Sequence, residues 1–168
     1  MDNDLETIFL TALEENQDRL LRISSSYTED TSEAQDLFQE VLINIWRALP
    51  NFKGDSAIST WMYRIALNVS LRHRAKLNRE KSRFSRLKSL TIEQVVHDEN
   101  ESSDKNKLFF LRSCIRTLDD ADKAVITLYL EELSYREISK ITGLKENTIA
   151  VKVKRIKEKL LNCIKEKV

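Results

Sequence analysis

Glycine and proline are nearly absent from this chain, which has two glycines and one proline among its 168 residues. These residues supply most tight turns and interrupt helices, so their scarcity favours long, unbroken helices. β-Branched residues also do not alternate with polar residues over any long run, as half-buried strands require. The sequence therefore predicts an all-α protein, long enough for one or two small domains with apolar cores.

The net charge of +1 conceals blocks of alternating sign. Residues 1–60 carry 4 basic and 12 acidic side chains, whereas residues 61–90 carry 9 basic and 1 acidic. Residues 91–104 have 5 acidic and no basic side chains, and residues 138–168 have 9 basic and 3 acidic ones. Acidic surface suits protein partners and basic surface suits nucleic acid, so the blocks predict separate partners. Solvated helix faces are the alternative, which explains single charges better than blocks.

Residues 36–68 contain two helix patterns joined by a turn. In the first helix, apolar residues recur at helical spacing, namely Leu37, Phe38, Val41, Leu42, Ile45, Trp46 and Leu49. Pro50 ends this helix and Gly54 permits a tight reversal. Asp55 or Ser56 can then cap a second helix over residues 57–76.

This second predicted helix has two distinct faces. Its core face is made of Ile58, Met62, Ile65, Ala66 and Val69. Another face carries Trp61, Arg64, Asn68 and Arg72. An aromatic ring beside guanidinium and amide groups suits an unstacked base and its phosphates. The spacing alone leaves open the alternative of an ordinary helix with a buried tryptophan.

A helix is also predicted before this stretch, over residues 4–27. Its buried side consists of Leu5, Ile8, Phe9, Ala12, Leu13, Leu20 and Ile23. Residues 27–32 form a short polar connection, in which Thr31 or Ser32 can cap the next helix.

The composition changes sharply after the two helices of residues 36–68. Residues 72–88 are densely basic and compatible with helix, a composition that attracts phosphate and makes binding dependent on salt. Residues 89–106 contain Ser, Asn, Asp and Glu, with no basic residue before Lys105. This composition predicts a mobile linker between two units, residues 1–88 and 107–168.

The second unit has the pattern of a helix-turn-helix. Its first helix has core-spaced Leu108, Leu111, Cys114, Ile115 and Leu118, and the next begins with the acidic residues Asp119, Asp120 and Asp122. Ser134 and Glu137 then form a capping box, and Gly143 suits the left-handed position after a short helix. A helix of about eight residues, a turn with glycine and a longer helix make the helix-turn-helix arrangement.

The longer helix, predicted over residues 146–165, also sorts its residues by face. Its core stripe is Ile149, Val153, Ile156, Leu160 and Ile164. Asn147, Val151 and Lys154 lie on the opposite side, flanked by Ala150 and Arg155. An exposed valine between an amide and cations suits a DNA major groove, where apolar groups meet the thymine methyl and cations meet guanine or phosphate.

We find no catalytic constellation in the sequence. His73 and His97 are isolated, paired CxxC and HExxH motifs are absent, and two glycines cannot build a phosphate-cradling loop. Cys114 and Cys163 are interpreted as small core residues of a cytoplasmic protein. No cofactor, bound metal or small-molecule substrate is therefore expected, and the protein is predicted not to be an enzyme. The absence of a signal-like or membrane-spanning apolar run predicts a soluble, cytoplasmic protein without direct membrane insertion.

The amino-acid sequences of two stretches resemble those of a known family. DLFQEVLINIWRAL followed by FKGDSAISTWMYRIALN resembles the core domain of bacterial sigma factors, most closely the extracytoplasmic-function group, over more than thirty positions. LSYREISKITGLKENTIAVKVKRIKEKL resembles the sigma-factor domain that reads the minus-thirty-five promoter element. Together the two stretches occur in the order and spacing of the family. One departure is Lys145, where the family has a small polar cap at the start of the helix.

The resemblance implies a promoter-specificity subunit that binds core RNA polymerase, recognises the minus-thirty-five and minus-ten elements and starts promoter melting. It also implies an anti-sigma protein as a further partner. The residues implied to dock on the polymerase are Asp36, Gln39, Glu40, Asn44 and Arg47. Those implied at the minus-ten element are Phe52, Lys53, Ser56, Ser59, Thr60, Trp61, Arg64, Asn68, Arg72 and Lys76. Those implied at the minus-thirty-five element are Tyr135, Arg136, Lys145, Asn147, Thr148, Ala150, Val151, Lys152, Lys154 and Arg155.

Three other functional classes compete with this interpretation. A stand-alone helix-turn-helix regulator leaves the match in residues 36–68 unexplained, and a helical adaptor that binds no DNA leaves both basic blocks unexplained. A nucleic-acid hydrolase needs clustered acidic metal ligands, which the sequence lacks. The sigma-factor interpretation accounts for all of these features together.

Overall fold

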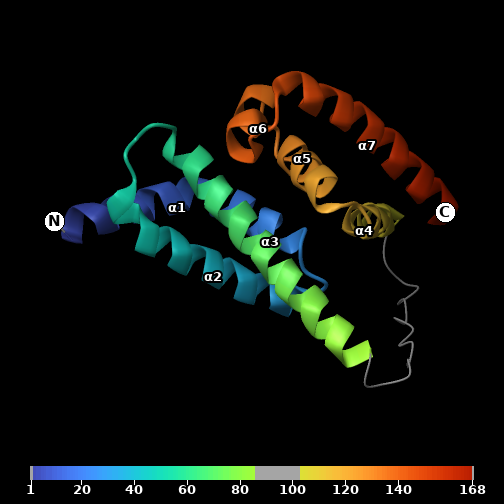
Figure 1. Cartoon of the computed structure of the whole chain (residues 1–168), viewed down its shortest axis with the longest axis horizontal. Helices are drawn as coiled ribbons and strands as arrows, with labels where there is room; N and C mark the ends of the chain where they lie inside the picture. Colours follow the sequence, from blue (N-terminus) through green and yellow to red (C-terminus); the bar gives the residue numbers. More distant parts are fainter. Residues whose placement is uncertain (1, 86–102, 168) are drawn as a thin grey trace.

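The computed structural model describes residues 2–85 and 103–167, and these residues are almost entirely helical (Figure 1). The elements are α1 (Asp2–Ser25), α2 (Thr31–Ala48), the short 3-10 helix η1 (Leu49–Asn51), α3 (Ile58–Ser85), α4 (Ser103–Arg116), α5 (Asp120–Leu130), α6 (Tyr135–Thr142) and α7 (Glu146–Lys167). No strand occurs in the described part of the chain. The all-α prediction is confirmed.

Helices α1, α2 and α3 pack on one another around a shared apolar core. Leu20, Ile23, Leu37, Ile45 and Met62 are almost completely buried there. A buried polar contact crosses this core, because the Tyr63 hydroxyl donates a hydrogen bond of 2.5 Å to Oδ1 of Asn16. The expected core face of α3 is largely as predicted, with Ala66 and Val69 buried and Ile58 and Ile65 partly buried.

Several local features of this first unit differ from the sequence expectation. Asp30, rather than Thr31 or Ser32, caps α2, since its side chain accepts from the backbone N–H of Glu33. Ile8 was expected in the core but is 46% exposed. Neither predicted residue caps α3: Ser56 bonds instead to the carbonyl of Ala57, at 3.3 Å.

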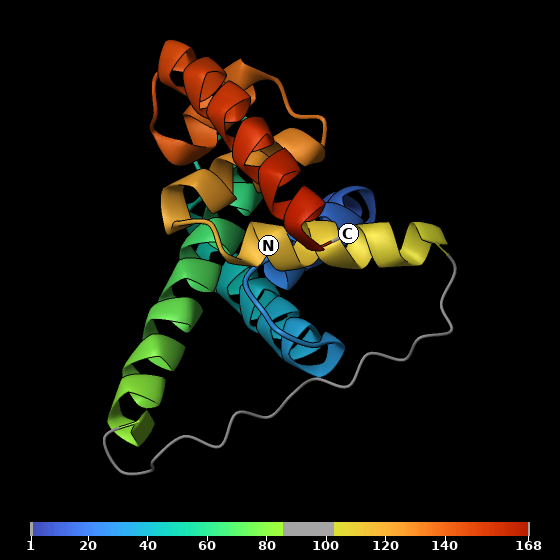
Figure 2. The same cartoon turned by 90° about the vertical axis from the view of Figure 1, so that its right-hand side faces the viewer.

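Helix α3 continues to Ser85, well beyond the predicted end near residue 76. Arginine, lysine, leucine and alanine have high helix propensity, so the basic segment extends the helix instead of ending it. Figure 2 shows the consequence: the C-terminal half of α3 projects away from the other helices.

The second unit, α4 to α7, is built as its local signals predicted. Asp119 caps α5, and Ser134 and Glu137 form both hydrogen bonds of the capping box on α6. Gly143 ends α6 with a φ of 78°, in the left-handed region where glycine is favoured. Residues 103–106, which were predicted to belong to the linker, are part of α4. Residues 89–102 of that linker lie outside the described residues.

The two units lie against each other in the folded chain. Helix α6 contacts α3, and Figure 1 shows α5, α6 and α7 stacked beside the three-helix unit. Arg22 of α1 donates two hydrogen bonds to the carboxylate of Glu131, at 2.6 and 2.8 Å. Lys123 of α5 is buried with its ammonium over the ring of Tyr27. The contact between the two units therefore combines apolar packing with charge pairs.

Cys114 and Cys163 are bonded to each other, which the sequence analysis did not anticipate. The disulfide joins α4 to the last part of α7, across 49 residues of sequence. Cys114 is buried in the core and Cys163 packs against it, as expected of small core residues, but helical packing also brings the two thiols together although they are distant in sequence. The bond closes the second unit into a covalent loop.

We expect reduction of this disulfide to lower the free energy of unfolding of the second unit by about 4 kcal/mol, because the unfolded chain regains the entropy of a closed loop of this length. Urea unfolding followed by circular dichroism, with and without dithiothreitol, measures the difference. The double variant Cys114→Ser, Cys163→Ser is the control and should not respond to the reductant. Equal unfolding midpoints for oxidised and reduced wild-type protein contradict the expectation.

Candidate nucleic-acid interface

The loop before α3 places one aromatic ring against another. Phe52 follows η1, and its ring lies 4.9 Å from the ring of Trp61, centroid to centroid. Gly54, with a φ of 76°, allows the chain to reverse between Phe52 and the start of α3. Both rings are only partly buried, so the pair lines the edge of the core and stays accessible from solvent. Such a ring pair offers a stacking surface to a planar ligand.

Polar side chains continue from this ring pair along one face of α3. Arg64, Asn68, Arg72 and Lys76 are all exposed. Among the described residues Asn68 has no hydrogen-bond partner, whereas the Arg64 guanidinium donates to the backbone carbonyl of Lys140 in α6. One of the predicted DNA-contacting side chains, Arg64, is therefore hydrogen-bonded to the second unit.

The other predicted residues of this region differ in accessibility. Lys53 is exposed, and Ser56 and Ser59 are partly buried. Thr60 is buried, so its hydroxyl is not presented to a ligand in this structure. The structure thus brings Phe52, Trp61 and the exposed face of α3 together and leaves Thr60 inside the core.

A second candidate surface lies on α2. Asp36, Gln39, Glu40 and Arg47 are exposed, and Asn44 is partly buried with its amide donating to the carbonyl of Glu40, at 2.8 Å.

Two apolar residues accompany these polar side chains on α2: Ile43, 49% exposed, and Trp46, 45% exposed. Trp46 belongs to the apolar residues that recur at helical spacing, and its ring lies edge-on against Phe9, 5.3 Å away, at the rim of the bundle. Ile43 was not singled out by the sequence analysis. Its signal was present, since positions 36, 40, 43 and 47 share one side of a helix.

A third candidate surface is the exposed side of α7 and the start of α6. Val151 is 67% exposed, and Asn147, Thr148 and Lys154 are exposed beside it. Ala150 is partly buried. Tyr135, Arg136 and Lys145 are also exposed, at the helix starts on either side of the turn.

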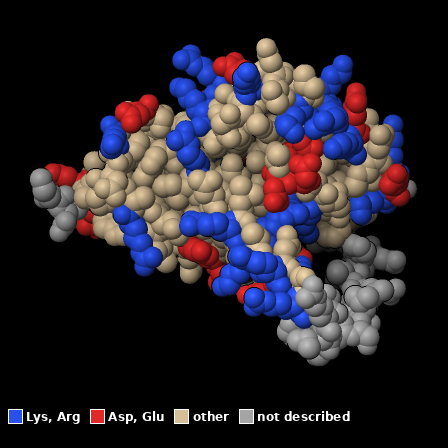
Figure 3. Space-filling view, viewed as in Figure 1, with Lys and Arg blue, Asp and Glu red and all other residues tan. Residues whose placement is uncertain are grey.

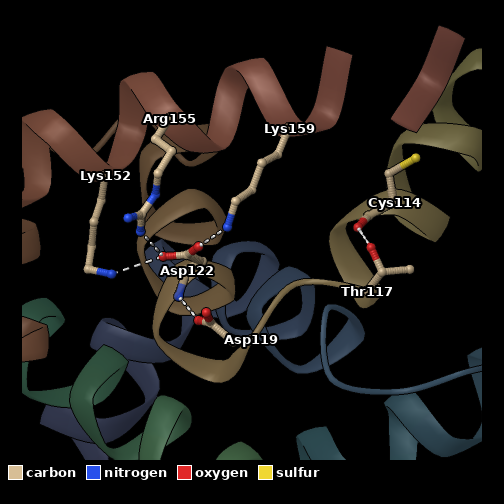
Figure 4. Close-up of polar contacts among 7 residues, drawn as sticks. All are labelled: Cys114, Thr117, Asp119, Asp122, Lys152, Arg155 and Lys159. Carbon is tan, nitrogen blue, oxygen red and sulfur yellow. Dashed lines mark hydrogen bonds and ion pairs between the residues drawn. The ribbon is translucent and has the colours of Figure 1, made fainter. Parts of the chain in front are cut away.

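Two further predicted DNA contacts on α7 face inward toward a buried carboxylate. Asp122 of α5 is completely buried, and three cations of α7 surround it (Figure 4). The ammonium of Lys152 lies 3.0 Å from its carboxylate, a guanidinium nitrogen of Arg155 lies at 3.2 Å, and the ammonium of Lys159 lies at 3.1 Å. Lys152 and Arg155 thus fasten α7 to α5 in this structure, while Lys154 and Val151 remain on the open side.

The charges around Asp122 set its protonation. Burial raises its pKa, but hydrogen bonds from Lys152 and Lys159 outweigh burial, and the net pKa is lower than usual. The carboxylate is therefore ionised near neutral pH and holds the three cations of α7 as charge-assisted partners.

This chain is similar to known proteins over both of its units. The profile of Sigma-70 region 2 matches residues 12–80, and that of Sigma-70 region 4 matches residues 111–160. The ECF RNA polymerase sigma-E factor of Haemophilus influenzae is 31% identical over 140 residues, covering 77% of this chain and 73% of that protein. The chain belongs to the extracytoplasmic-function sigma factors. It is a promoter-specificity subunit of RNA polymerase.

Two further similarities differ in how much of this sigma factor they cover. The RNA polymerase sigma-H factor of Pseudomonas aeruginosa is 47% identical, but over only 57 residues, which cover 34% of this chain and 30% of that protein. A solved structure of the sigma factor RpoE in complex with the anti-sigma factor NepR, from Bartonella quintana, has a TM-score of 0.69 and 22% identity. It covers 96% of this chain and 97% of that one, so the fold extends over both units.

The sigma factor also has a groove between its two units. A cavity of about 540 Å³ lies between α1, α4 and α5, lined by the apolar residues Leu108, Leu111, Ile115 and Leu130 among others. Arg19, Arg22, Arg112 and Arg116 also line it. No helix within the described residues is long and apolar enough to cross a membrane, and these residues contain no cluster of His, Cys, Asp and Glu suited to a metal ion.

We expect Asp122→Asn to lower the free energy of unfolding by about 3 kcal/mol at pH 7, because it removes the charge that compensates three cations around a buried site. The pKa of Asp122 is lowered on folding, so its contribution is present above its ordinary value of 3.8 and is lost as the pH falls below that value. Urea unfolding of both proteins between about pH 3 and about pH 7 measures this loss.

The matched control for this measurement is Asp104→Asn, whose carboxylate is exposed and, among the described residues, pairs with Lys107 on the same helix. It should leave stability nearly unchanged. A difference between wild type and Asp122→Asn that stays constant down to pH 3 contradicts the assigned role of the carboxylate.

Proposed function

We propose that this sigma factor binds core RNA polymerase through the exposed face of α2, holds one flipped base of the minus-ten element at the Phe52–Trp61 pair, and reads the minus-thirty-five element with α7. The observation that carries the proposal is one face of α3, where a partly exposed aromatic pair and Asn68, an amide without a partner among the described residues, lie about two turns apart on the same side of the helix. Stacking and edge recognition need these two kinds of group on one surface.

The energetics of base flipping fit this face of α3. Extruding a base costs a few kcal/mol, and stacking on aromatic side chains returns about 1–3 kcal/mol per base. Asn68 can both donate and accept, so it can read the edge of the extruded base. Arg64, Arg72 and Lys76 would hold the adjacent phosphates, with Lys53 at the entrance of the loop.

For the minus-thirty-five element, the accessible residues carry the proposal. Val151 and Lys154, with Asn147, would contact base edges, while Tyr135, Arg136 and Lys145 hold phosphates. Lys152 and Arg155 are already bound to Asp122, so we assign them chiefly to orienting α7. Arg155 is half exposed and has further N–H groups, which leaves it able to contact DNA as well.

In this structure the two units lie against each other, an arrangement that we call the closed form, and this contact affects when DNA can bind. Arg64 donates to Lys140 of α6, so α6 must move from α3 before Arg64 can hold a phosphate. We propose residues 1–88 and 107–168 as two functional units that separate on the promoter, with residues 89–106 between them. Two solved structures similar to this chain are complexes: one of the sigma factor RpoE with the anti-sigma factor NepR, and one of CnrH with the cytosolic domain of CnrY.

These similarities support an anti-sigma partner for this chain too, one that binds the closed form. The apolar groove between the units, with its arginines, is the surface that we propose for it. We further propose that the protein works in the cytoplasm, where promoter DNA and polymerase are found. The chain itself would perform no catalysis, since nucleotide polymerisation belongs to the polymerase.

The variant Asn68→Ala should form the holoenzyme and the closed promoter complex normally but yield about tenfold less open complex, because one base loses its edge contact, worth about 1–3 kcal/mol. Preference at one minus-ten base should also weaken. Permanganate footprinting of promoter thymines on duplex and pre-melted templates measures opening. Asn78→Ala, on an exposed part of α3 away from this face, is the control. An Asn68→Ala protein that opens duplex promoters like wild type, with unchanged base preference, refutes the pocket.

Ile43→Ser should weaken binding to core polymerase about tenfold, since a half-exposed isoleucine at the centre of the polar docking residues would lose about 1.5 kcal/mol of apolar burial. Gln39→Ala and Glu40→Ala should also weaken binding. Leu10→Ser removes a similarly exposed apolar residue from α1 and should have no effect on binding. Titration of labelled sigma factor with core polymerase gives the affinities, and equal affinities for Ile43→Ser and wild type, with unchanged circular dichroism, exclude this docking surface.

A further inference from the structure

Helix α4 is held in the second unit by few buried side chains. Of the side chains in α4 that the structure describes, Cys114 and Ile115 alone are buried, and both lie in its last turn. Leu108 and Phe109, earlier in the helix, are 47% and 42% exposed. A helix with so little buried apolar surface opens locally at a low cost in free energy. The position of α4 therefore depends strongly on any further attachment that it has.

The disulfide between Cys114 and Cys163 is such an attachment. It joins the last turn of α4 to the C-terminal part of α7, the helix against which α4 packs (Figure 1). A second attachment is a hydrogen bond from the ammonium of Lys123 in α5 to the carbonyl of Arg116, at 3.2 Å. This hydrogen bond lies beyond the disulfide along the chain, so it fixes the end of α4 but not the turns before Cys114.

The two bonded cysteines differ in exposure. Cys114 is completely buried, whereas Cys163 is partly exposed, so an incoming thiolate reaches the pair from the side of Cys163. Lys159 and Lys167 are exposed one turn before and one turn after Cys163, with one acidic neighbour at similar spacing, Glu166. Figure 3 shows Lys and Arg side chains along this end of α7. Cations beside a cysteine favour the thiolate, which is the reactive form in thiol–disulfide exchange.

Reduction at this site exchanges two electrons and two protons with a dithiol. One thiolate of the reductant attacks the sulfur of Cys163, the bond to Cys114 breaks, and Cys114 leaves as a thiolate that takes up a proton. The second thiol of the reductant then attacks the mixed disulfide and passes its proton to Cys163, and the reductant becomes an internal disulfide. In the reverse direction hydrogen peroxide oxidises one thiol to a sulfenic acid, which the other thiol converts to the disulfide, and two water molecules are released.

The setting in which a sigma factor works makes a permanent disulfide unusual. Promoter DNA and RNA polymerase lie in the cytoplasm, where glutathione and thioredoxin keep most thiols reduced. Disulfides of proteins in this compartment are usually transient and redox-sensing. Both cysteines of the chain form the one bond, so its reduction changes no other cysteine.

Helix α4 also forms one wall of the groove between the two units. From α4, the cavity of about 540 Å³ is lined by Leu108, Leu111, Arg112, Ile115 and Arg116. The first three precede Cys114, so they lie in the turns whose position depends on the disulfide. Release of these turns removes most of this wall, and the groove then loses its shape.

We propose that the bond between Cys114 and Cys163 is a redox modification site, at which a dithiol reductant releases residues 103–113 and oxidation restores the groove. The surface proposed above for an anti-sigma protein then exists only in the oxidised form. This inference rests on the proposed function for the cytoplasmic setting and for the use of the groove. The redox step itself needs neither DNA nor polymerase, so it is tested on the free chain.

The first test measures whether the bond responds to the reductants of the cytoplasm. The full chain is equilibrated with glutathione buffers that cover the cytoplasmic poise, its free thiols are blocked with iodoacetamide, and mass spectrometry counts them. A redox site should pass from oxidised to reduced within this range. A bond that stays oxidised in the most reducing buffer overturns the proposal, as does a pair of thiols that stays reduced in the most oxidising one.

The second test measures which part of the second unit is released by reduction. Oxidised chain, and reduced chain freed of dithiothreitol under nitrogen, are digested briefly with trypsin, and mass spectrometry follows each cut. Cleavage after Arg112 should be about tenfold faster in the reduced chain, because α4 opens locally. Cleavage after Lys123, which is buried in α5, is the internal control and should stay slow. Equal acceleration at both sites, or none after Arg112, overturns the proposal.

The double variant Cys114→Ser, Cys163→Ser cannot form the bond, so trypsin should cut it after Arg112 at the rate of the reduced chain, whether or not it was treated with dithiothreitol. A rate equal to that of the oxidised chain contradicts the role of the bond. Where the variant does not fold, the comparison of oxidised and reduced wild-type chain still decides. Failure of the proposed function appears separately, as a chain that does not bind core polymerase or open a promoter.

Discussion

The packing of α3 against α1 and α2 constrains every other surface of the first unit. Met62 and Ala66 are completely buried, and the buried hydrogen bond between Tyr63 and Asn16 fixes the rotation of α3 about its axis. Once that rotation is fixed, Trp61, Asn68 and the cations beyond them must point outward together. The proposed chemistry on DNA is thus a direct consequence of how the core is filled. Any substitution that rotated α3 would move the whole ligand face at once.

Charged side chains also form ion pairs between the two units of this chain. Arg22 and Arg74 belong to the first unit, and their carboxylate partners, Glu131 and Asp120, belong to the second. These pairs are partly exposed, so each contributes little free energy and is weakened by salt. The ion pairs therefore hold the two units together only weakly, and the strength of this contact depends on the salt concentration.

Local signals in the sequence predicted the parts of the structure that local forces decide. The capping box of Ser134 and Glu137, the turn at Gly143 and the exposure of Val151 could all be deduced from neighbouring residues. The environments of Trp46 and Ile8 could not, because they depend on how far α1 covers α2. The end of α3 was misplaced since no residue in the basic segment stops a helix.

The second unit shows the same limit more clearly. Asp122 was interpreted only as a favourable residue in the first turn of α5. In the structure it binds three cations of α7, which follow it by 30, 33 and 37 residues in the sequence. That convergence exists only after α5 and α7 are packed. The pairing of Cys114 with Cys163 likewise follows from the packing of α4 on α7, which spacing in the sequence does not reveal.

The disulfide has a geometric consequence for how the second unit can move. Because Cys114 is bonded to Cys163, α4 cannot detach from α7 when the units separate. The second unit therefore moves as one covalently closed body: any displacement of α4, where the chain enters this unit, carries the last part of α7 with it.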